Sequence, residues 1–158
     1  MASARSYPMT VALAALAIAG TAACSPIETA NPYNASDGVR VQLGSSLTAE
    51  NLLIISAAAG EPGALIGGLT NRSGDDVRVT LAATGTDDVT VQVKAGGTVL
   101  LGGADDAAVV LDSVDVPPGA VLPMTISTPA GGSQQVSVPV LDGSLSEYTD
   151  LVPTPQSS

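Results

Sequence analysis

A strict alternation of apolar and polar residues constrains this chain more than any other feature. It is clearest between Gly63 and Val93, where two turns, each with a glycine and an aspartate pair, separate three apolar runs. In residues 77–81 and 89–93, every second residue is Val or Leu, and the residues between them are Arg, Thr or Gln. A period of two is typical of strands with one buried face and one exposed face. Short strands that follow one another across turns predict an antiparallel sheet.

The same pattern continues on both sides of this stretch. Further strands are predicted at residues 39–43, 47–56, 98–101, 108–111, 122–127 and 136–140. In the second of these segments, Leu52–Ile55 form an unbroken apolar run, which a helix could also explain. The flanking glycine and serine residues and the β-branched pair favour a strand that is buried on both faces.

Prolines and glycines mark the turns between these segments. Pro118 and Gly119 suit the two central positions of a type II turn, because the second position needs a positive φ. Pro139 predicts an edge strand, since proline cannot donate to a ladder. Gly67 and Gly68, like the other glycine pairs, are interpreted as turns or strand kinks. The seven to nine expected strands predict an all-β fold, an antiparallel β-sandwich of immunoglobulin-like or cupredoxin-like type.

We expect the core of this sandwich to lack aromatic side chains. The chain is 45% hydrophobic but has no Phe and no Trp, and its three tyrosines, Tyr7, Tyr33 and Tyr148, lie in segments that flank the predicted strands. Val, Leu, Ile and Ala must therefore fill the interior, which suits two packed sheets. A domain of about 105 residues buries enough surface to fold without disulfides.

The first 24 residues are typical of an export signal. Arg5 is their only charged residue, and the apolar run at residues 9–19 is shorter than the ~20 residues that span a bilayer. Small residues at positions 20–23 lead into Cys24, the only cysteine. This pattern resembles the lipobox of bacterial lipoproteins, although Thr21 stands where that motif usually has Leu. The resemblance implies that Cys24 is acylated; the alternative is an ordinary secretory signal that leaves Cys24 as a free thiol.

These observations divide the chain into four parts. Residues 1–23 are predicted to be a lipoprotein signal peptide, and residues 24–37 a lipidated N-terminus and flexible tether. Residues 38–142 are the predicted β-sandwich, and residues 143–158, rich in Pro, Ser and Thr, a disordered tail. The expected location is the extracytoplasmic face of the cell membrane, because two or more acyl chains on Cys24 would give stable anchoring.

Net charge and the absence of histidine exclude several classes of function. The chain has 15 acidic and 5 basic residues, for a net charge of -10, and no histidine. A surface of this charge repels phosphate backbones, so nucleic acid is excluded as a partner. Without histidine, the chain has neither a histidine metal site nor Ser-His or Cys-His catalysis. We therefore predict that it is not an enzyme and has no cofactor.

Three aspartate pairs are the remaining candidates for a metal site. All lie in predicted turns; they are Asp75 and Asp76, Asp87 and Asp88, and Asp105 and Asp106. If the pairs met at one end of the sandwich, they could supply the six to eight oxygens that Ca²⁺ prefers. Their spacing matches no calcium-binding loop, however. Turn formation and solubility are the simpler explanation.

Several segments together resemble a known family. They are Glu50–Ile55, Gly63–Asn71 and the glycine pair before Val99–Leu101, which follow a lipobox and a proline-containing tether. In these segments the chain resembles the small envelope lipoproteins of actinobacteria related to mycobacterial LpqE. More distantly, through Leu69–Gly74, it is similar to the PCuAC-type periplasmic copper chaperones. The resemblance covers most of residues 38–142 and implies a cupredoxin-like sandwich.

The resemblance to the copper chaperones does not extend to their metal ligands. That family binds Cu(I) through paired histidines and methionines, whereas this chain has no histidine and, beyond the signal, only Met124. The copper site therefore cannot be carried over. The resemblance to the LpqE-related lipoproteins implies an accessory role beside respiratory oxidase complexes. The resulting hypothesis is a membrane-anchored, non-catalytic accessory module with a protein partner in the envelope, at residues not yet identified. The alternative is a carrier of a metal or a lipid.

Overall fold

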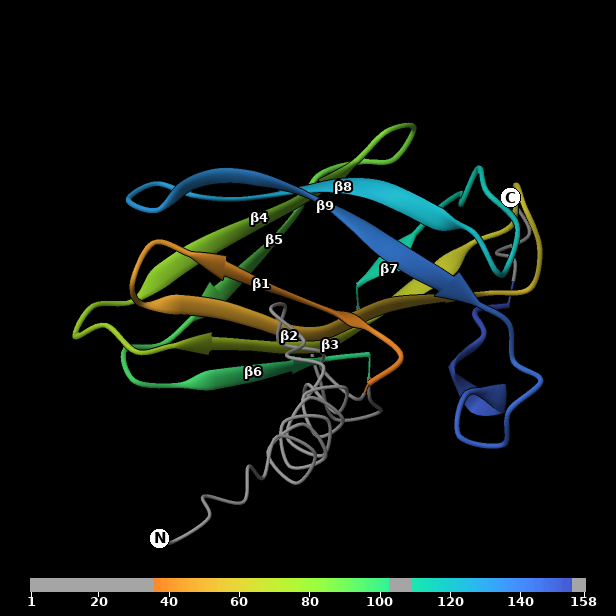
Figure 1. The fold of residues 1–158 in the computed structure, drawn as a ribbon, viewed down its shortest axis with the longest axis horizontal. Helices are drawn as coiled ribbons and strands as arrows, with labels where there is room; N and C mark the ends of the chain where they lie inside the picture. Colours follow the sequence, from red (N-terminus) through yellow and green to blue (C-terminus); the bar gives the residue numbers. More distant parts are fainter. Residues whose placement is uncertain (1–35, 103–108, 155–158) are drawn as a thin grey trace, which may run out of the picture. The chain divides into compact units, whose positions relative to one another are not determined.

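The alternating segments form β-strands in the structure, a computed structural model that describes residues 36–102 and 109–154. Nine strands lie within this part of the chain (Figure 1). They are β1 (Val39–Leu43), β2 (Leu47–Ser56), β3 (Gly63–Asn71), β4 (Val77–Ala83), β5 (Val89–Val93), β6 (Thr98–Leu101), β7 (Val110–Leu111), β8 (Val121–Thr128) and β9 (Gly132–Leu141). The strand predicted at residues 108–111 corresponds to β7, and its first residue lies outside the described part.

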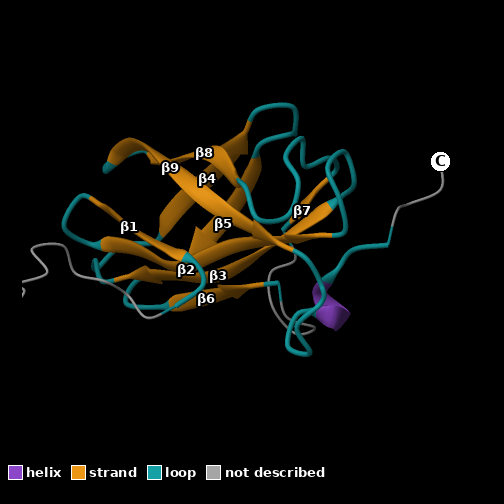
Figure 2. Ribbon diagram, turned by 45° about the vertical axis from the view of Figure 1, so that its right-hand side comes forward, coloured by secondary structure: helices purple, strands orange, loops and turns teal. Residues whose placement is uncertain are grey.

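The strands pack as two layers (Figure 2). The first sheet contains β1, β2, β3, β6 and β7, and the second contains β5, β4, β8 and β9 in that order. One short parallel pairing, of Ile54 and Ile55 in β2 with Val140 and Leu141 in β9, joins the layers into a mixed, nearly closed sheet. All other pairings within the described residues are antiparallel. The predicted all-β sandwich is confirmed.

The interior between the sheets is aliphatic. The alternate residues of β8, Leu122, Met124 and Ile126, are at most 4% exposed and pack in one cluster with alternate residues of the other strands. Each fully buried Val or Leu side chain contributes about 1.5–3 kcal/mol relative to an exposed one. Leu53 and Ile55 lie outside this cluster and yet have no exposed surface. The centre of β2 is therefore buried on both faces, as its unbroken apolar run predicts.

The turn before β8 has the predicted geometry. Gly119 has a φ of 89°, and the Ala120 amide donates to the Pro117 carbonyl oxygen at 3.1 Å, as a type II turn requires.

Pro139 in β9 pairs with Val121 of β8 on one side. On its other side, the pairing with β2 begins only at the following residue. The prediction of an edge strand is therefore wrong, because β9 lies between β8 and β2, but the missing amide hydrogen of Pro139 falls just before the pairing with β2 begins.

A bulge interrupts β2 at Asn51 and shapes the outer face of the first sheet. The register with β3 shifts between Glu50 and Leu53, and Asn51 has a φ of 52°, which Asn tolerates better than most residues. Its Oδ1 accepts a hydrogen bond from the Gly38 amide at 2.9 Å. Opposite the bulge, Gly67 has a φ of 141°. Alternation alone did not predict this irregularity.

The C-terminal segment differs from the prediction. Residues 143–154, expected to be disordered, form a turn and a 3-10 helix at Thr149–Leu151. Tyr148 Oη donates to Asp37 Oδ2 at 2.7 Å, and this bond, aided by burial, raises the pKa of Tyr148 to about 12. Thr149 Oγ1 donates to the Gly143 carbonyl oxygen at 2.9 Å. The composition of this segment, rich in Pro, Ser and Thr, predicted disorder. Composition does not show that the Tyr148 hydroxyl contacts Asp37 at the start of the domain.

The predictions for the N-terminal part lie outside the described residues. These are the signal peptide at residues 1–23, the acylation of Cys24 and the tether up to residue 35. Among the residues that the structure does describe, no helix is long and apolar enough to cross a membrane.

Candidate functional site

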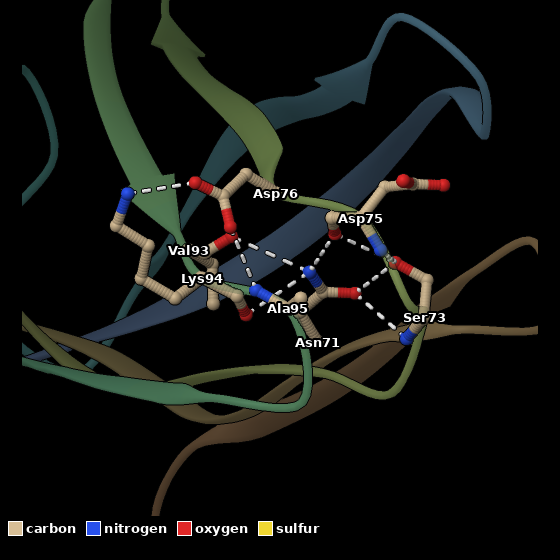
Figure 3. A network of polar contacts seen from close by, with 7 residues as sticks. All are labelled: Asn71, Ser73, Asp75, Asp76, Val93, Lys94 and Ala95. Carbon is tan, nitrogen blue, oxygen red and sulfur yellow. Dashed lines mark hydrogen bonds and ion pairs between the residues drawn. The ribbon is translucent and has the colours of Figure 1, made fainter.

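The buried amide of Asn71 organises the turns at one end of the sandwich (Figure 3). Its Nδ2 donates to the carbonyl oxygens of Asp75 at 2.7 Å, Lys94 at 3.1 Å and Val93 at 3.3 Å. Its Oδ1 accepts from the Ser73 amide at 2.9 Å and from Ser73 Oγ at 2.7 Å. The side chain has no exposed surface, and every buried polar side-chain atom in the described residues has a partner. Asn71 therefore fastens the β3–β4 turn to the end of β5, which is a structural role.

In the first aspartate pair, Asp75 and Asp76, the carboxylate of Asp76 is held by hydrogen bonds from the end of β5. Its Oδ2 accepts from Lys94 Nζ at 2.7 Å, and its Oδ1 accepts from the Ala95 amide at 2.9 Å. The bond from Lys94 and then the bond from Ala95 lower the pKa of the Asp76 carboxyl. Both carboxylate oxygens are thus occupied by protein donors (Figure 3).

The second aspartate pair lies at the opposite end of β4. Asp87 and Asp88 are exposed in the turn between β4 and β5, and Asp75 and Asp76 precede β4. The seven residues of β4 span roughly 20 Å, so the two turns are about that far apart. The structure does not bring these pairs together, and no group of three or more His, Cys, Asp or Glu residues gathers within residues 36–102 and 109–154.

The third pair, Asp105 and Asp106, lies outside the described residues, as does Cys24. Calcium binding at the aspartate turns therefore has no geometric support from the two pairs that can be placed.

An open hollow lies over Gly67 and Gly68, which are inside β3 and not in a turn. We call it the Gly68 groove; its volume is about 490 Å³, within the range of ligand and peptide sites. It opens on the face of the first sheet that points away from the core, because Leu69 on the opposite face is fully buried between the sheets. Leu100, which is 55% exposed, and Leu151 of the 3-10 helix contribute apolar walls.

Polar side chains form the rim of the groove. Thr70 and Thr98 lie opposite each other on β3 and β6, and their hydroxyl oxygens are 3.0 Å apart. Glu50 pairs with Gly68 across β2 and β3, and its carboxylate lies 3.4 Å from Nε of Arg40. Both members of this ion pair are about half exposed, so solvent screens it.

Gly67 and Gly68 differ in whether the fold requires a glycine at that position. At Gly67, a Cβ would lie 2.9 Å from the carbonyl oxygens of Glu50 and Asn51, and the positive φ strains any other residue. At Gly68, φ is not positive, and a Cβ would meet only Leu100 Cδ2 at 3.6 Å, an ordinary contact. Only Gly67 is therefore required by the fold. The sequence signal for the groove was a glycine pair inside an alternating run, which was interpreted as a turn or kink.

A smaller cavity, of about 250 Å³, lies at the end of the sandwich between two hairpin turns. Its lining includes Gly44–Ser46 from the β1–β2 turn and Thr128 and Gly131 from the β8–β9 turn. The Gly131 amide donates to Thr128 Oγ1 at 2.8 Å, which closes that turn. This volume falls below that of most small-molecule sites. The Gly68 groove is therefore the better candidate.

Comparison with known proteins gives a fold and no family. No protein-family model matches the chain, and no curated protein matches it either. Among solved structures, the fold is similar to that of PCuAC domains. An apo PCuAC domain from PmoF1 matches with a TM-score of 0.53 and 12% identity, over 65% of this chain and 98% of that one.

Two structures of the PCuAC domain from PmoF2 match to a similar degree. The copper-bound form has a TM-score of 0.50 and 17% identity, over 66% of this chain and 98% of that one. The apo form has a TM-score of 0.51 and 13% identity, over 68% of this chain and 98% of that one. At these identities the similarity concerns the fold, and it agrees with the cupredoxin-like sandwich that the sequence predicts.

The donor set of this chain does not fit a copper ion of the kind that one of these domains holds. The chain has no histidine, and its only methionine in the described part, Met124, is 1% exposed in the core. Copper(I) prefers soft sulfur and imidazole ligands, and the described surface offers neither. The fold is thus similar to that of a copper-bound domain, whereas the described residues supply no histidine and no exposed methionine to hold copper.

Proposed function

We propose that this protein is a non-catalytic binding module of the cell envelope that uses the Gly68 groove to dock a protein partner. The observation that carries the proposal is the groove itself, an open hollow of about 490 Å³ with an exposed leucine on the surface of a well-packed sandwich. A concave surface with apolar walls is typical of a binding site. A PCuAC-like fold without copper donors leaves the scaffold free for such a role.

A membrane anchor on Cys24 would hold this module at the extracytoplasmic face. The support is the run of small residues before the only cysteine, which follows a short apolar segment. Residues 24–37 would then act as the tether, and the acyl chains would provide stable attachment. In this arrangement the module acts as an accessory subunit of a membrane complex, and the resemblance to the LpqE-related lipoproteins suggests a respiratory oxidase.

The anchor can be tested by fractionation. Cys24→Ala should move the protein from the membrane fraction to the soluble fraction, and Ser25→Ala, which alters the adjacent residue, should leave it in the membrane. A Cys24→Ala protein that remains in the membrane after a high-salt wash would refute lipid anchoring through this residue.

The binding role can be tested by cross-linking in the native membrane. The wild-type full chain should enrich the same protein partner in repeated experiments. The full chain with Gly68→Val, which fills the groove, should enrich that partner less. Failure of the wild-type chain to enrich any protein in repeated experiments would count against the binding role.

A lipid carrier is the second candidate, because the groove is large enough for part of an acyl chain and has apolar walls. Native mass spectrometry of the full chain separates the two roles. A lipid that co-purifies in a fixed ratio and is lost in Gly68→Val would favour the carrier; protein without bound lipid would favour partner docking.

A further inference from the structure

Gly68 has no structural explanation within the fold. A glycine inside a strand destabilises it by roughly 0.5–1 kcal/mol relative to alanine, because the unfolded chain is more flexible and no side chain packs. Neither the backbone φ nor the available space requires a glycine here, since a Cβ would make an ordinary contact with Leu100. Glycine at such a position often marks the close approach of another backbone or a ligand. The missing side chain is what creates the floor of the groove.

The strand beside Gly68 presents unpaired backbone groups. Among the described residues, β6 lies at one end of the strand order and pairs with β3 on one side only. The Asn71 amide donates to the Gly97 carbonyl oxygen at 2.9 Å, so Asn71 and Gly97 are a hydrogen-bonded pair. Because such pairs alternate along an antiparallel ladder, the backbone groups of Thr98 and Leu100 point away from β3. Their N–H and C=O groups face the free edge.

Apart from its short length, the edge of β6 lacks the usual protection against strand addition. Edge strands of monomers are commonly blocked by charged side chains, prolines or bulges. At the other end of the strand order, β5 runs directly into Lys94, which is paired with Asp76. The four residues of β6, Thr-Val-Leu-Leu, include no charge and no proline, and Leu100 is 55% exposed. This edge is therefore suited to pair with another extended chain.

The charge of the chain indicates the charge of that partner. The net charge is -10; because Glu50 on the rim of the groove is paired with Arg40, the attraction comes from the overall charge of the chain. A cationic segment would be attracted to this surface, and an acidic one repelled. A second copy of this chain is disfavoured by the same charge and by the short edge, since four residues bury far less than the area of a stable dimer.

We propose that an extended, cationic segment of a partner protein pairs with the free edge of β6 and lays an aromatic side chain across Leu100 toward the Gly68 groove. Adjacent strands are about 4.8 Å apart, so a side chain on the added strand must span two spacings to reach Gly68. An extended aromatic side chain brings the edge of its ring past Leu100 to the rim of the groove, where the missing side chain at Gly68 leaves room for it. This inference rests on the proposed binding function and specifies its partner.

The test uses a defined probe and the full chain, purified in a non-ionic detergent. The probe is a short fluorescein-labelled peptide that alternates lysine with phenylalanine or valine, and its binding is followed by fluorescence anisotropy. Gly68→Val fills the groove without changing the charge and should weaken binding by roughly tenfold or more, the loss typical of an interface hot spot. Its melting temperature should equal or exceed that of the wild type, so misfolding does not explain the loss.

Two substitutions at one position separate backbone pairing from side-chain contact. Leu100→Ala removes the exposed side chain and keeps the outward amide, whereas Leu100→Pro removes that amide as well, on the side away from β3. Leu100→Pro should therefore bind the peptide more weakly than Leu100→Ala. Val121→Ala, at another exposed apolar residue on the second sheet, is the control and should bind as the wild type does.

The possible results separate failure of the docking inference from failure of the proposed binding function. If Gly68→Val and the wild type bind the peptide equally, attraction is only electrostatic and the docking inference is wrong. If the peptide does not bind the wild type, the inference is wrong as well. If cross-linking in the membrane captures a partner equally with both chains, the binding function stands and the groove is not its site. A partner captured by the wild type and lost in Gly68→Val would support both.

Discussion

Two positions on β3, three residues apart, differ in how fully the fold explains them. The side chain of Asn71 is buried, and its amide satisfies carbonyl and hydroxyl groups of two turns. Gly68 lies on the outer face, where neither φ nor space requires a glycine. The contacts of Asn71 thus give it a structural role, whereas the fold does not require the glycine at position 68. Substitutions should therefore affect stability at Asn71 and binding at Gly68.

The largest expected effect is at Asn71. Asn71→Ala removes the donor for three carbonyl oxygens and the acceptor for Ser73, and we expect the free energy of unfolding to fall by about 2–3 kcal/mol. In a domain of this size, that corresponds to a melting temperature lower by about 10 °C or more. Differential scanning calorimetry measures the change. Thr70→Ala, which removes only an exposed hydroxyl contact, is the control, and equal stability of the two variants would contradict the structural role of Asn71.

The next effect compares the two glycines directly. Gly67→Ala places a methyl group 2.9 Å from the carbonyl oxygens of Glu50 and Asn51 at a positive φ, and should lower the free energy of unfolding by about 2 kcal/mol. Urea denaturation gives this value. A Gly67→Ala protein as stable as the wild type would mean that the β2 bulge does not have the described geometry.

A smaller effect is expected in the C-terminal segment. Tyr148→Phe removes the hydrogen bond to Asp37 and should cost about 0.5 kcal/mol, with faster proteolysis of residues 143–154. Because the pKa of Tyr148 is raised to about 12 from an ordinary value of 10, this bond is fully present below pH 10 and is lost as the pH rises through 12. Tyrosinate absorbance, recorded as the difference between the wild type and Tyr148→Phe, follows the titration. A tyrosine that ionises near pH 10 would show that the contact does not persist in solution.

The smallest change in stability is expected at Gly68, and its sign is the informative part. Gly68→Ala should raise the free energy of unfolding by about 0.5 kcal/mol, because the methyl group fits and the unfolded chain becomes less flexible. Urea denaturation beside Gly67→Ala gives a matched pair. A loss of stability at Gly68 as large as that at Gly67 would mean that the fold itself needs both glycines.

Sequence patterns predicted the elements that depend on local alternation. The inward residues of β4, β5 and β8 follow directly from the period of two, and the turn at Pro118 and Gly119 follows from their backbone preferences. The bulge at Asn51 was not predictable, because register depends on the partner strand and not on the segment itself. The short parallel pairing of β2 with β9 and the contact of Tyr148 with Asp37 join residues far apart in the chain, and no local pattern reports them.

The candidate site was less predictable than the fold. The aspartate pairs were conspicuous in the sequence, but the two that the structure describes lie at opposite ends of β4. The groove depends on what is missing at Gly68 and on the exposure of Leu100, which lies opposite it on the neighbouring strand. Neither feature is visible until the register of β3 and β6 is known.

The affinity of the cationic strand peptide for Gly68→Val, relative to the wild type, tests the central claim most directly. The melting temperature of each protein is measured on the same sample. If Gly68 is kept for binding, the variant is at least as stable as the wild type and binds the peptide roughly tenfold or more weakly. Equal affinity in two equally stable proteins would contradict the claim that the Gly68 groove is a docking site.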